Sequence, residues 1–340
     1  MLSLIELSGS PYQCGFALGR FGAASAHDFL INSPSWHSVM SWRGSETARH
    51  MAALVEQHFP LILQELQGLA DGLDLPFEDV LLWNCRGDVW SMSPDGCTTV
   101  QLPSAKGPRI THNEDGDPGF AGHCGIGLFK PDNAPSFASF VYPASLPGHT
   151  FAANQHGLAI TVNNLRSRQV SPGVPRMVLC RALLEQASLE SCRDLLDSHP
   201  KAGGFHLSMA QKGRADLLSV EFNARGVSTR SIDRPGVHAN HIIHPEMSDF
   251  PQVITDSSRM RQARGDALLA QGQHDPLRIL ADRDDPELPI YRDAPDDSDN
   301  ENTMATADFR VGADAVVWQV YERPGLPFRY QLSDAELASE

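Results

Sequence analysis

Two short catalytic motifs are missing from this sequence of 340 residues. It has no Gly-x-Ser-x-Gly segment, which presents the serine nucleophile of α/β-hydrolases on a sharp turn. It also has no Gly-x-x-x-x-Gly-Lys-Ser/Thr segment, the loop that cradles nucleotide phosphates. These absences exclude a serine hydrolase of the α/β type and a P-loop nucleotide hydrolase.

Long hydrophobic runs are also missing. No uninterrupted apolar stretch reaches the roughly 20 residues that a membrane-spanning helix needs. The first seven residues are too short and too acidic for a secretory signal peptide. We therefore expect a cytoplasmic protein that has no membrane partner.

Basic residues are few: 27 Lys and Arg stand against 42 Asp and Glu, and the formal net charge is −15. Such a charge disfavours binding to nucleic acids and to anionic membranes. It permits a cationic or amine-bearing substrate without requiring one.

Cysteines are few and scattered, and no Cys-x-x-Cys pair occurs. The pattern favours neither a disulfide framework nor a zinc ribbon, so at most one or two cysteines should have a special role. The six are Cys14, Cys85, Cys97, Cys124, Cys180 and Cys192.

The secondary-structure pattern changes at about residue 97. Before it, apolar residues recur at helical spacing over 45–58, 61–72 and 76–83, with Gly72 as the expected C-cap of the second helix. After it, strand-like runs alternate with turns, and helices are expected near 175–186, 188–198 and 257–271. The pattern predicts an α+β fold in which helices cover antiparallel sheets. The expected strands are 97–102, 109–113, 136–142, 150–154, 158–163, 205–211, 216–223, 238–243, 303–310 and 315–321.

The segment 282–301 carries nine acidic residues, opposed only by Arg283 and Arg292. Runs of like charge usually lie in water, so we expect a solvated surface loop. A rim that attracts amines is the alternative interpretation.

Gly96-Cys97 places a thiol directly after a glycine and before the β-branched run Thr98-Thr99-Val100. Glycine tolerates strained backbone geometry, and a cysteine thiolate is a strong nucleophile near neutral pH. If Cys97 attacked the Gly96 carbonyl, the chain would break and Cys97 would gain a free α-amine. The pKa of an unperturbed α-amine, about 7.7–8.0, suits a general base. A buried structural cysteine is the other interpretation.

The two strands after Gly96 predict a partner for this thiol. If their turn centres on Ala105–Lys106, the numbers of antiparallel partners sum to 211–212. Cys97 then lies opposite Glu114 or Asp115, where a carboxylate could orient the thiol and the new amine. The segment 115–119 also has the composition of a polar turn.

His238, His241 and His244 recur at every third position and raise the possibility of a metal site. On a strand, however, the first and last face one side and the middle one faces the other. No nearby Cys or acidic pair completes a tetrahedral set, so we expect no metal there. Asn240, within the same segment, is either an oxyanion donor or a turn residue.

Gly96-Cys97-Thr98-Thr99, with Asp115 eighteen positions after Cys97, resembles the acyl-coenzyme A:6-aminopenicillanic acid acyltransferase family of N-terminal nucleophile hydrolases. Further landmarks in the same order extend the resemblance along most of the chain. They are 9–15, 65–72, 79–84, 154–165, 173–185, His238-x-Asn240-His241 and Tyr291-Arg292.

The resemblance implies a four-layer αββα fold and a precursor that cuts itself between Gly96 and Cys97. Residues 1–96 would then form a mostly helical chain that stays associated with a catalytic core of residues 97–340, within one structural domain. The product would be a heterodimer of the two chains that could assemble further. No cofactor or metal is implied.

The resemblance also implies site residues. Cys97 matches the nucleophile and its α-amine the base, and Asp115 matches the acid that supports cleavage. Asn240 matches the oxyanion donor. Arg292 and Asn163 match residues near or lining the same site.

Two positions depart from the family acyltransferase, which implies an altered substrate pocket. Glu114 replaces an aromatic residue before the acid, and Tyr291 replaces a small hydroxyl residue before the arginine. The run His-Asn-Glu-Asp at 112–115 is closer to relatives that hydrolyse β-alanyl amides of biogenic amines. We hypothesise that Glu114 holds the ammonium group of an aminoacyl substrate.

We therefore expect an autoprocessing cysteine amidohydrolase or acyltransferase that cleaves or exchanges the amide of a small N-acyl amine. One alternative is a catalytically inactive binding protein on the same fold. Another is a metal-dependent hydrolase that uses His238, His241 and His244.

Overall fold

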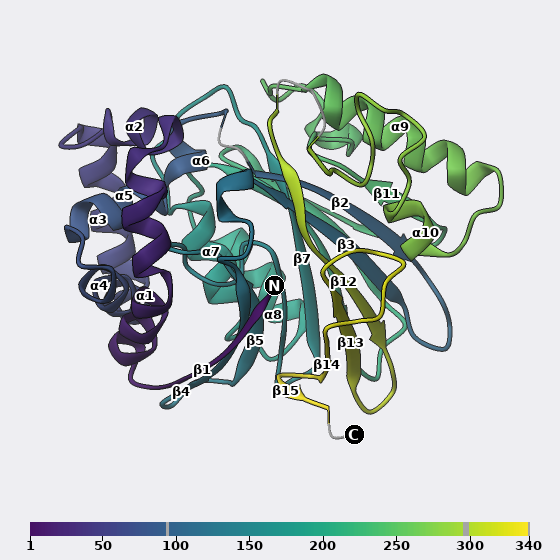
Figure 1. Cartoon of the computed structure of the whole chain (residues 1–340), viewed down its shortest axis with the longest axis horizontal. Helices are drawn as coiled ribbons and strands as arrows, with labels where there is room; N and C mark the ends of the chain where they lie inside the picture. The colour runs from purple at the N-terminus through teal and green to yellow at the C-terminus, as the bar shows by residue number, and fades with distance from the viewer. Residues whose placement is uncertain (93–94, 295–298, 339–340) are drawn as a thin grey trace.

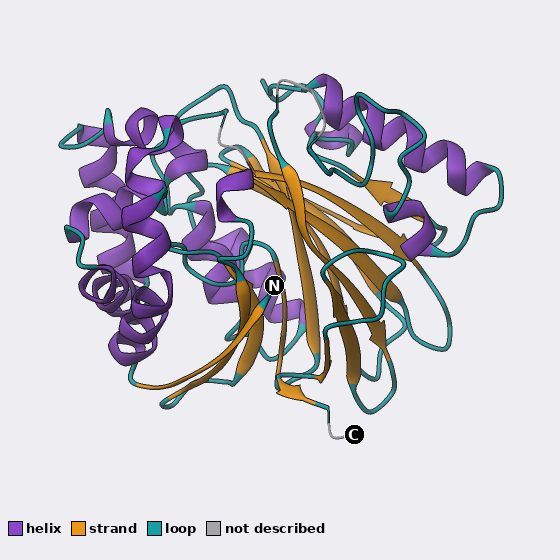
Figure 2. Ribbon diagram, viewed as in Figure 1, coloured by secondary structure: helices purple, strands orange, loops and turns teal. Residues whose placement is uncertain are grey.

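The computed structural model describes residues 1–92, 95–294 and 299–338. Two β-sheets lie face to face, and helices cover the outer face of each (Figure 1; Figure 2). The four-layer αββα arrangement expected from the resemblance is therefore confirmed. In the described part of the chain, no helix is long and apolar enough to cross a membrane.

The first sheet has eight strands in the order β1-β4-β5-β6-β7-β8-β9-β10. Among the described residues, β1 and β4 form its one parallel pair, and the other neighbours are antiparallel. The strands are β1 Ser3–Gly9, β4 Gly125–Pro131, β5 Phe137–Val141, β6 Phe151–Asn154, β7 Leu158–Leu165, β8 Gly204–Gln211, β9 Leu217–Asn223 and β10 Gly226–Ser231.

The second sheet has seven antiparallel strands in the order β11-β2-β3-β12-β13-β14-β15. The β2–β3 hairpin lies near one edge, next to the three-residue strand β11. The strands are β2 Asp95–Leu102, β3 Arg109–Gly116, β11 Gly236–His238, β12 Asn302–Val311, β13 Val316–Tyr321, β14 Tyr330–Ser333 and β15 Glu336–Leu337.

Helices from several parts of the chain cover the sheets. The helices on the side of the first sheet are α1 Pro11–Asp28, α2 Pro34–Met40, α3 Glu46–His58, α4 Pro60–Leu73, α5 Phe77–Trp83, α6 Arg86–Val89, α7 Arg176–Leu183 and α8 Leu189–Ser198, of which α2 and α3 pack on other helices. The second is covered by α9 Asp256–Ala270 and α10 Pro276–Leu280, which contact β2, β3 and β11.

Glycines bring α1 and α4 into backbone contact. A Cβ on Gly15 would stand 1.9 Å from the Glu65 carbonyl oxygen, and one on Gly72 would stand 2.2 Å from the Phe16 carbonyl oxygen. Glycine permits such a close approach because it has no side chain. Gly72 is thus an interior contact of α4 and the prediction that it caps the helix is wrong. Asp74, with φ of 56°, ends the helix instead.

Two further expectations are corrected. The strand expected at 238–243 ends at His238, because the next residues bond to side chains of α9 and its surroundings. The acidic segment is only partly solvated: Asp284 and Asp293 are exposed, whereas Asp299 and Glu301 are buried. Asp296 and Asp297 lie outside the described residues.

Candidate active site

The register of the β2–β3 hairpin sets the frame of the site. Cys97 lies opposite Glu114, and Thr99 lies opposite His112. The predicted register is confirmed, and it selects Glu114 rather than Asp115 as the cross-strand partner of Cys97. Asp115 lies opposite Gly96.

Alternation along the strands separates the two faces of this hairpin. Thr99 Oγ1 donates to Asn163 Oδ1 of β7 across 2.8 Å, so its face of β2 looks toward the first sheet. Cys97 and its partner Glu114 share that face. On the opposite face, Asn113 donates to the carbonyl of Leu280 in α10. The thiol therefore lies between the two sheets.

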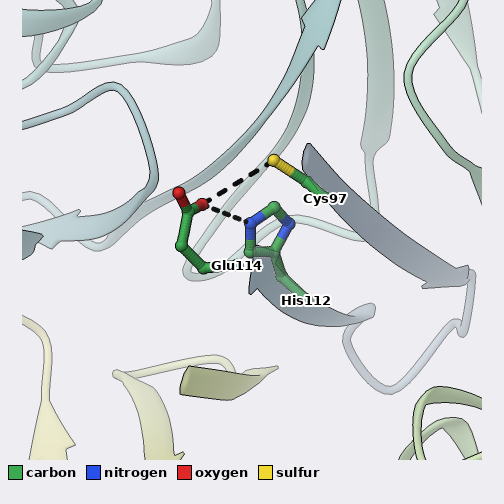
Figure 3. Close-up of side chains that lie close together, drawn as sticks. All are labelled: Cys97, His112 and Glu114. Atoms are coloured by element: carbon green, nitrogen blue, oxygen red, sulfur yellow. Dashed lines mark hydrogen bonds and ion pairs between the residues drawn. The ribbon is translucent and has the colours of Figure 1, made fainter. Parts of the chain in front are cut away.

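Three side chains converge on this inner face, and we call them the thiol cluster: Cys97, His112 and Glu114 (Figure 3). The Cys97 thiol donates to Glu114 Oε2 across 3.7 Å. The same carboxylate oxygen lies 3.2 Å from His112 Nε2, and His112 Nδ1 lies 2.8 Å from Thr99 Oγ1. All three side chains are buried, with exposures of 3%, 0% and 2%.

Burial determines the protonation of this cluster. It raises the pKa of the Cys97 thiol well above its usual range, and the carboxylates of Glu114 and Asp115 add to the rise. A hydrogen bond from the backbone of Asn164 acts in the opposite direction. Burial also lowers the pKa of His112 to about 3. In the intact chain the thiol is therefore protonated and the imidazole is neutral, so attack requires a base.

Beside Cys97, the backbone hydrogen bonds that a neighbouring strand would make are made by side chains instead. β11 pairs His238 with Thr99 and then ends, which leaves the next position on that edge to Asn240. The Cys97 amide donates to Asn240 Oδ1 across 2.9 Å, and Arg261 Nη1 donates to the Cys97 carbonyl across 2.5 Å. These two side chains hold the backbone of Cys97 on both sides of its Cα: Asn240 the peptide unit before it and Arg261 the one after it.

Asn240 is itself held from three directions. Arg261 Nη2 donates to Asn240 Oδ1 across 2.7 Å, and Asn240 Nδ2 donates to the Asn164 carbonyl across 3.2 Å. The Asn240 amide donates to Ser258 Oγ. Its orientation is therefore defined before any substrate binds.

Gly96 lies against two carboxyl groups on the other face. A Cβ at this position would stand 2.0 Å from Glu301 Oε2 and 3.3 Å from Asp115 Cβ. Asp115 Oδ1 accepts from Thr303 Oγ1 across 2.6 Å. Glu301 Oε1 accepts from Arg166 across 2.8 Å, and burial raises the pKa of Glu301 to about 7. Among the described residues, Glu301 Oε2 has no hydrogen-bond partner.

Arg292 and Tyr291 lie at the start of the segment that carries Glu301. Arg292 donates through Nε to the Glu301 carbonyl and through Nη1 to Ser257 Oγ, so it fixes this segment to α9. The Tyr291 ring is packed against the guanidinium groups of Arg283 and Arg323.

Asn163 is fully buried, and both ends of its amide are engaged. Its Nδ2 donates to the His238 carbonyl across 3.1 Å. Its Oδ1 faces Thr99 Oγ1 and His206 Nδ1 at 2.8 and 3.0 Å. Asn163 is thus connected to the thiol cluster through Thr99 and His112.

The three spaced histidines do not converge on one point. His238 Nε2 pairs with Glu221, His241 Nδ1 with Ser258, and His244 with Ser219 and Ser228. In the described part of the chain, the group with metal-ligating geometry is the thiol cluster, whose ligand atoms lie within 4.8 Å of one another. The structure therefore disfavours the alternative of a metal-dependent hydrolase built on His238, His241 and His244.

Four residues of the site were missed by sequence reasoning: His112, Arg166, Arg261 and Glu301. A signal existed for His112, because it lies two residues before Glu114 and so on the same face. For Arg261 and Glu301 the sequence offers no such signal, since each is one charged residue among several in its segment.

Known proteins resemble this chain over much of its length. The sequence model of the family described as acyl-coenzyme A:6-aminopenicillanic acid acyl-transferase matches residues 104–324, a segment that begins after Cys97. The beta-alanyl-dopamine/carcinine hydrolase of Drosophila melanogaster is 26% identical over 239 residues, which are 63% of this chain and 59% of that protein. The chain thus spans about three fifths of that relative's length.

A solved structure, penicillin V acylase from Agrobacterium tumefaciens, is similar with a TM-score of 0.37 and 14% identity. The match covers 71% of this chain and 88% of that one. The family match covers more than half of the sequence. The chain belongs to the acyl-coenzyme A:6-aminopenicillanic acid acyl-transferase family.

Proposed function

We propose that this chain is an autoprocessing cysteine amidohydrolase or acyltransferase that acts on a small N-acyl amine, with Cys97 as the nucleophile. The observation that carries the proposal is the arrangement around the backbone and the thiol of Cys97. Asn240 and Arg261 hold the backbone of Cys97, while its thiol lies 3.7 Å from the Glu114 carboxylate.

In the self-cleavage step, Cys97 Sγ bonds to the Gly96 carbonyl carbon and the Gly96–Cys97 C–N bond breaks. The thiol proton passes to the departing nitrogen, which becomes the α-amine of Cys97. Water then hydrolyses the thioester and leaves a carboxylate on Gly96. Asp115, opposite Gly96, supports this step. Residues 1–96 and 97–340 then remain together as a heterodimer.

In the proposed catalytic cycle, the α-amine of Cys97 takes the thiol proton and the sulfur attacks the amide carbonyl of the substrate. The amine leaves with that proton, and water or a second amine resolves the thioester. Asn240 Nδ2 and the backbone N–H of Asn164 are the proposed oxyanion donors, a contribution that is typically worth about 3 kcal/mol. Arg292 and Asn163 act by positioning, and no cofactor takes part.

The proposal also identifies the acyl group of the substrate as β-alanyl or a similar aminoacyl group. A β-alanyl group carries an ammonium two methylene groups from its carbonyl, and the matched relative is a hydrolase of beta-alanyl amides by name. Glu114 is close enough to the thiol to meet such an ammonium, and the net charge of −15 agrees with a cationic substrate. We place Tyr291 at the edge of the substrate region because it precedes Arg292.

Intact-mass analysis of purified protein tests the nucleophile. We expect two fragments, 1–96 and 97–340, and in Cys97→Ala a single chain whose turnover is lower by at least about 1000-fold. An uncut wild-type chain without activity would favour a binding protein on the same fold. Full activity in Cys97→Ala would eliminate Cys97 as the nucleophile.

A matched pair of substrates tests the acyl group. β-Alanyl and butanoyl amides of the same amine differ in charge but hardly in size. Glu114→Gln should lower kcat/KM for the β-alanyl amide by about 10- to 100-fold relative to the butanoyl amide, as expected for losing a buried ion pair. An unchanged ratio would remove Glu114 from acyl recognition while leaving the nucleophile proposal intact.

A further inference from the structure

The thiol cluster has the geometry of a metal centre. We propose that Cys97, His112 and Glu114 bind a zinc ion and that the bound ion reversibly blocks the nucleophile. The inference does not depend on self-cleavage, because all three side chains are already together in the intact chain.

The backbone preorganises this cluster. Cys97 and Glu114 are cross-strand partners, and His112 is two residues from Glu114, so all three project from one face of one hairpin (Figure 3). Forming the site therefore needs no long loop to close. The side chains are almost fully buried, which limits competition from water for the ion.

Two of the three separations between ligand atoms match tetrahedral coordination, and the third, from sulfur to nitrogen, is within 4.8 Å. With Zn–S of about 2.3 Å and Zn–N and Zn–O of about 2.0 Å, neighbouring ligands lie about 3.5 Å apart for sulfur and oxygen and about 3.3 Å apart for nitrogen and oxygen. The corresponding separations here are 3.7 Å from Cys97 Sγ to Glu114 Oε2 and 3.2 Å from His112 Nε2 to that oxygen.

Hydrogen bonding behind the cluster determines which nitrogen of His112 can bind an ion. Asn163 Nδ2 donates to the His238 carbonyl, which can only accept, so Asn163 Oδ1 must face Thr99. Thr99 uses its one hydroxyl proton to donate to that oxygen. His112 Nδ1 must then donate to Thr99 Oγ1, which leaves a lone pair on Nε2 of the neutral ring.

That lone pair points at Glu114 Oε2 across 3.2 Å, so a divalent cation at this point would find a nitrogen and an oxygen ligand beside the thiol. The imidazole is also oriented by its other nitrogen, as zinc-binding histidines usually are.

The donor set selects the type of ion. One sulfur, one imidazole nitrogen and one carboxylate oxygen suit Zn²⁺ rather than Mg²⁺ or Ca²⁺, which prefer all-oxygen sites. Binding displaces the thiol proton to the solvent, so the affinity should rise with pH. Because the ion takes one lone pair of the thiolate and withdraws charge from the sulfur, it should suppress attack on a carbonyl carbon.

Zinc binding can be measured on the purified full-length protein by equilibrium dialysis with elemental analysis. We expect one Zn²⁺ per chain, and at least about 100-fold weaker binding in His112→Gln and in Glu114→Gln, since even outer-shell partners contribute 10- to 100-fold. Cys192→Ala, a buried cysteine of α8, is the matched control and should bind as the wild type does. Unchanged affinity in both cluster variants would overturn the proposal.

Two measurements keep the test independent of how the variants fold. Co²⁺ in the wild type should give a thiolate-to-metal charge-transfer band that Cys97→Ala lacks. Zn²⁺ should also protect Cys97 of the wild type from iodoacetamide, as mapped by peptide mass spectrometry, and a chelator should reverse the protection. Alkylation of Cys97 at the same rate with and without bound Zn²⁺ would show that the ion lies elsewhere.

Discussion

The two faces of the β2–β3 hairpin carry different parts of the site. The inner face, toward the first sheet, presents the thiol of Cys97 with Glu114 and His112. On the outer face, Asp115 and Glu301 pack against Gly96, where a side chain would not fit. Between the faces, along the strand edge, Asn240 and Arg261 hold the backbone.

This difference shows how the alternation of side chains along a strand can give the two residues of Gly96-Cys97 different roles. Successive side chains of a strand point to opposite faces, so Cys97 and Gly96 have different surroundings. Under the proposed function, the inner face would carry the proton chemistry, and the outer face and the strand edge would hold the Gly96–Cys97 peptide bond. A substitution can therefore alter the inner face without altering the outer face or the strand edge, and the reverse.

The largest effect should come from the strand edge. Arg261→Met removes the donors to the Cys97 carbonyl and to Asn240 Oδ1 and leaves both buried. We expect cleavage of newly made chain to slow by at least about 100-fold, as followed by intact mass over time. Arg264→Met, one turn further along α9, loses only ion pairs with Asp282 and Asp284 and should cleave normally. Equal rates in the two variants would contradict a specific role for Arg261.

The outer face can be tested by adding one methyl group. Gly96→Ala would place Cβ 2.0 Å from Glu301 Oε2, and relieving such overpacking typically costs 1–3 kcal/mol. We expect cleavage to slow by about 10- to 100-fold. With the neighbour shortened, Glu301→Ala and Gly96→Ala/Glu301→Ala should cleave at nearly the same rate, because the added methyl group then has room. If Gly96→Ala slows cleavage equally with and without the Glu301 side chain, the contact with Glu301 is not the cause.

Two buried Glu–Arg pairs can be compared: Glu65 with Arg181, far from Cys97, and Glu301 with Arg166, next to Gly96. Glu65 receives two hydrogen bonds from Arg181, between α4 and α7, whereas Glu301 Oε2 has no partner among the described residues. In an uncut Cys97→Ala background, Glu65→Gln should lower the free energy of unfolding in urea by about 3 kcal/mol, and Glu301→Gln by less. With Cys97 restored, Glu301→Gln should slow cleavage and Glu65→Gln should not. The reverse pattern would contradict the distinction.

The most gradual predicted effect, spread over several pH units, concerns the acid stability of the inner face. The folded pKa of His112, about 3, lies below its unfolded value of about 6.5. Its contribution to stability is therefore complete above pH 6.5 and is lost as the pH falls toward 3. In the Cys97→Ala background, the free energy of unfolding measured in urea from pH 7 to pH 4 should fall less steeply in His112→Gln, by up to about 1.4 kcal/mol per pH unit. If stability falls with pH equally in the variants with and without His112, then His112 is not buried in its neutral form.

The sequence predicted contacts between residues close in the chain better than contacts between residues far apart in it. The register of Cys97 and Glu114 follows from one short turn, and Asn240 was identified although its strand ends earlier than expected. Arg261 meets Cys97 across 164 residues of sequence, and Arg166 meets Glu301 across 135. Such partners depend on how α9 and the end of β7 pack against β2, which no short pattern encodes. For the same reason, Glu301 was assigned to a solvated loop although it is fully buried.

The parallel pairing of β1 with β4 joins residues 3–9 to residues 125–131, on opposite sides of Gly96–Cys97. If the chain is cut there, as proposed, this edge of the first sheet would be shared between two polypeptides. Folding before the cut is a first-order process, whereas refolding afterwards requires two molecules to meet and becomes second order. Cleavage would thus make the fold a one-time event, and the lifetime of the cut protein would be governed by how slowly it opens rather than by its equilibrium stability.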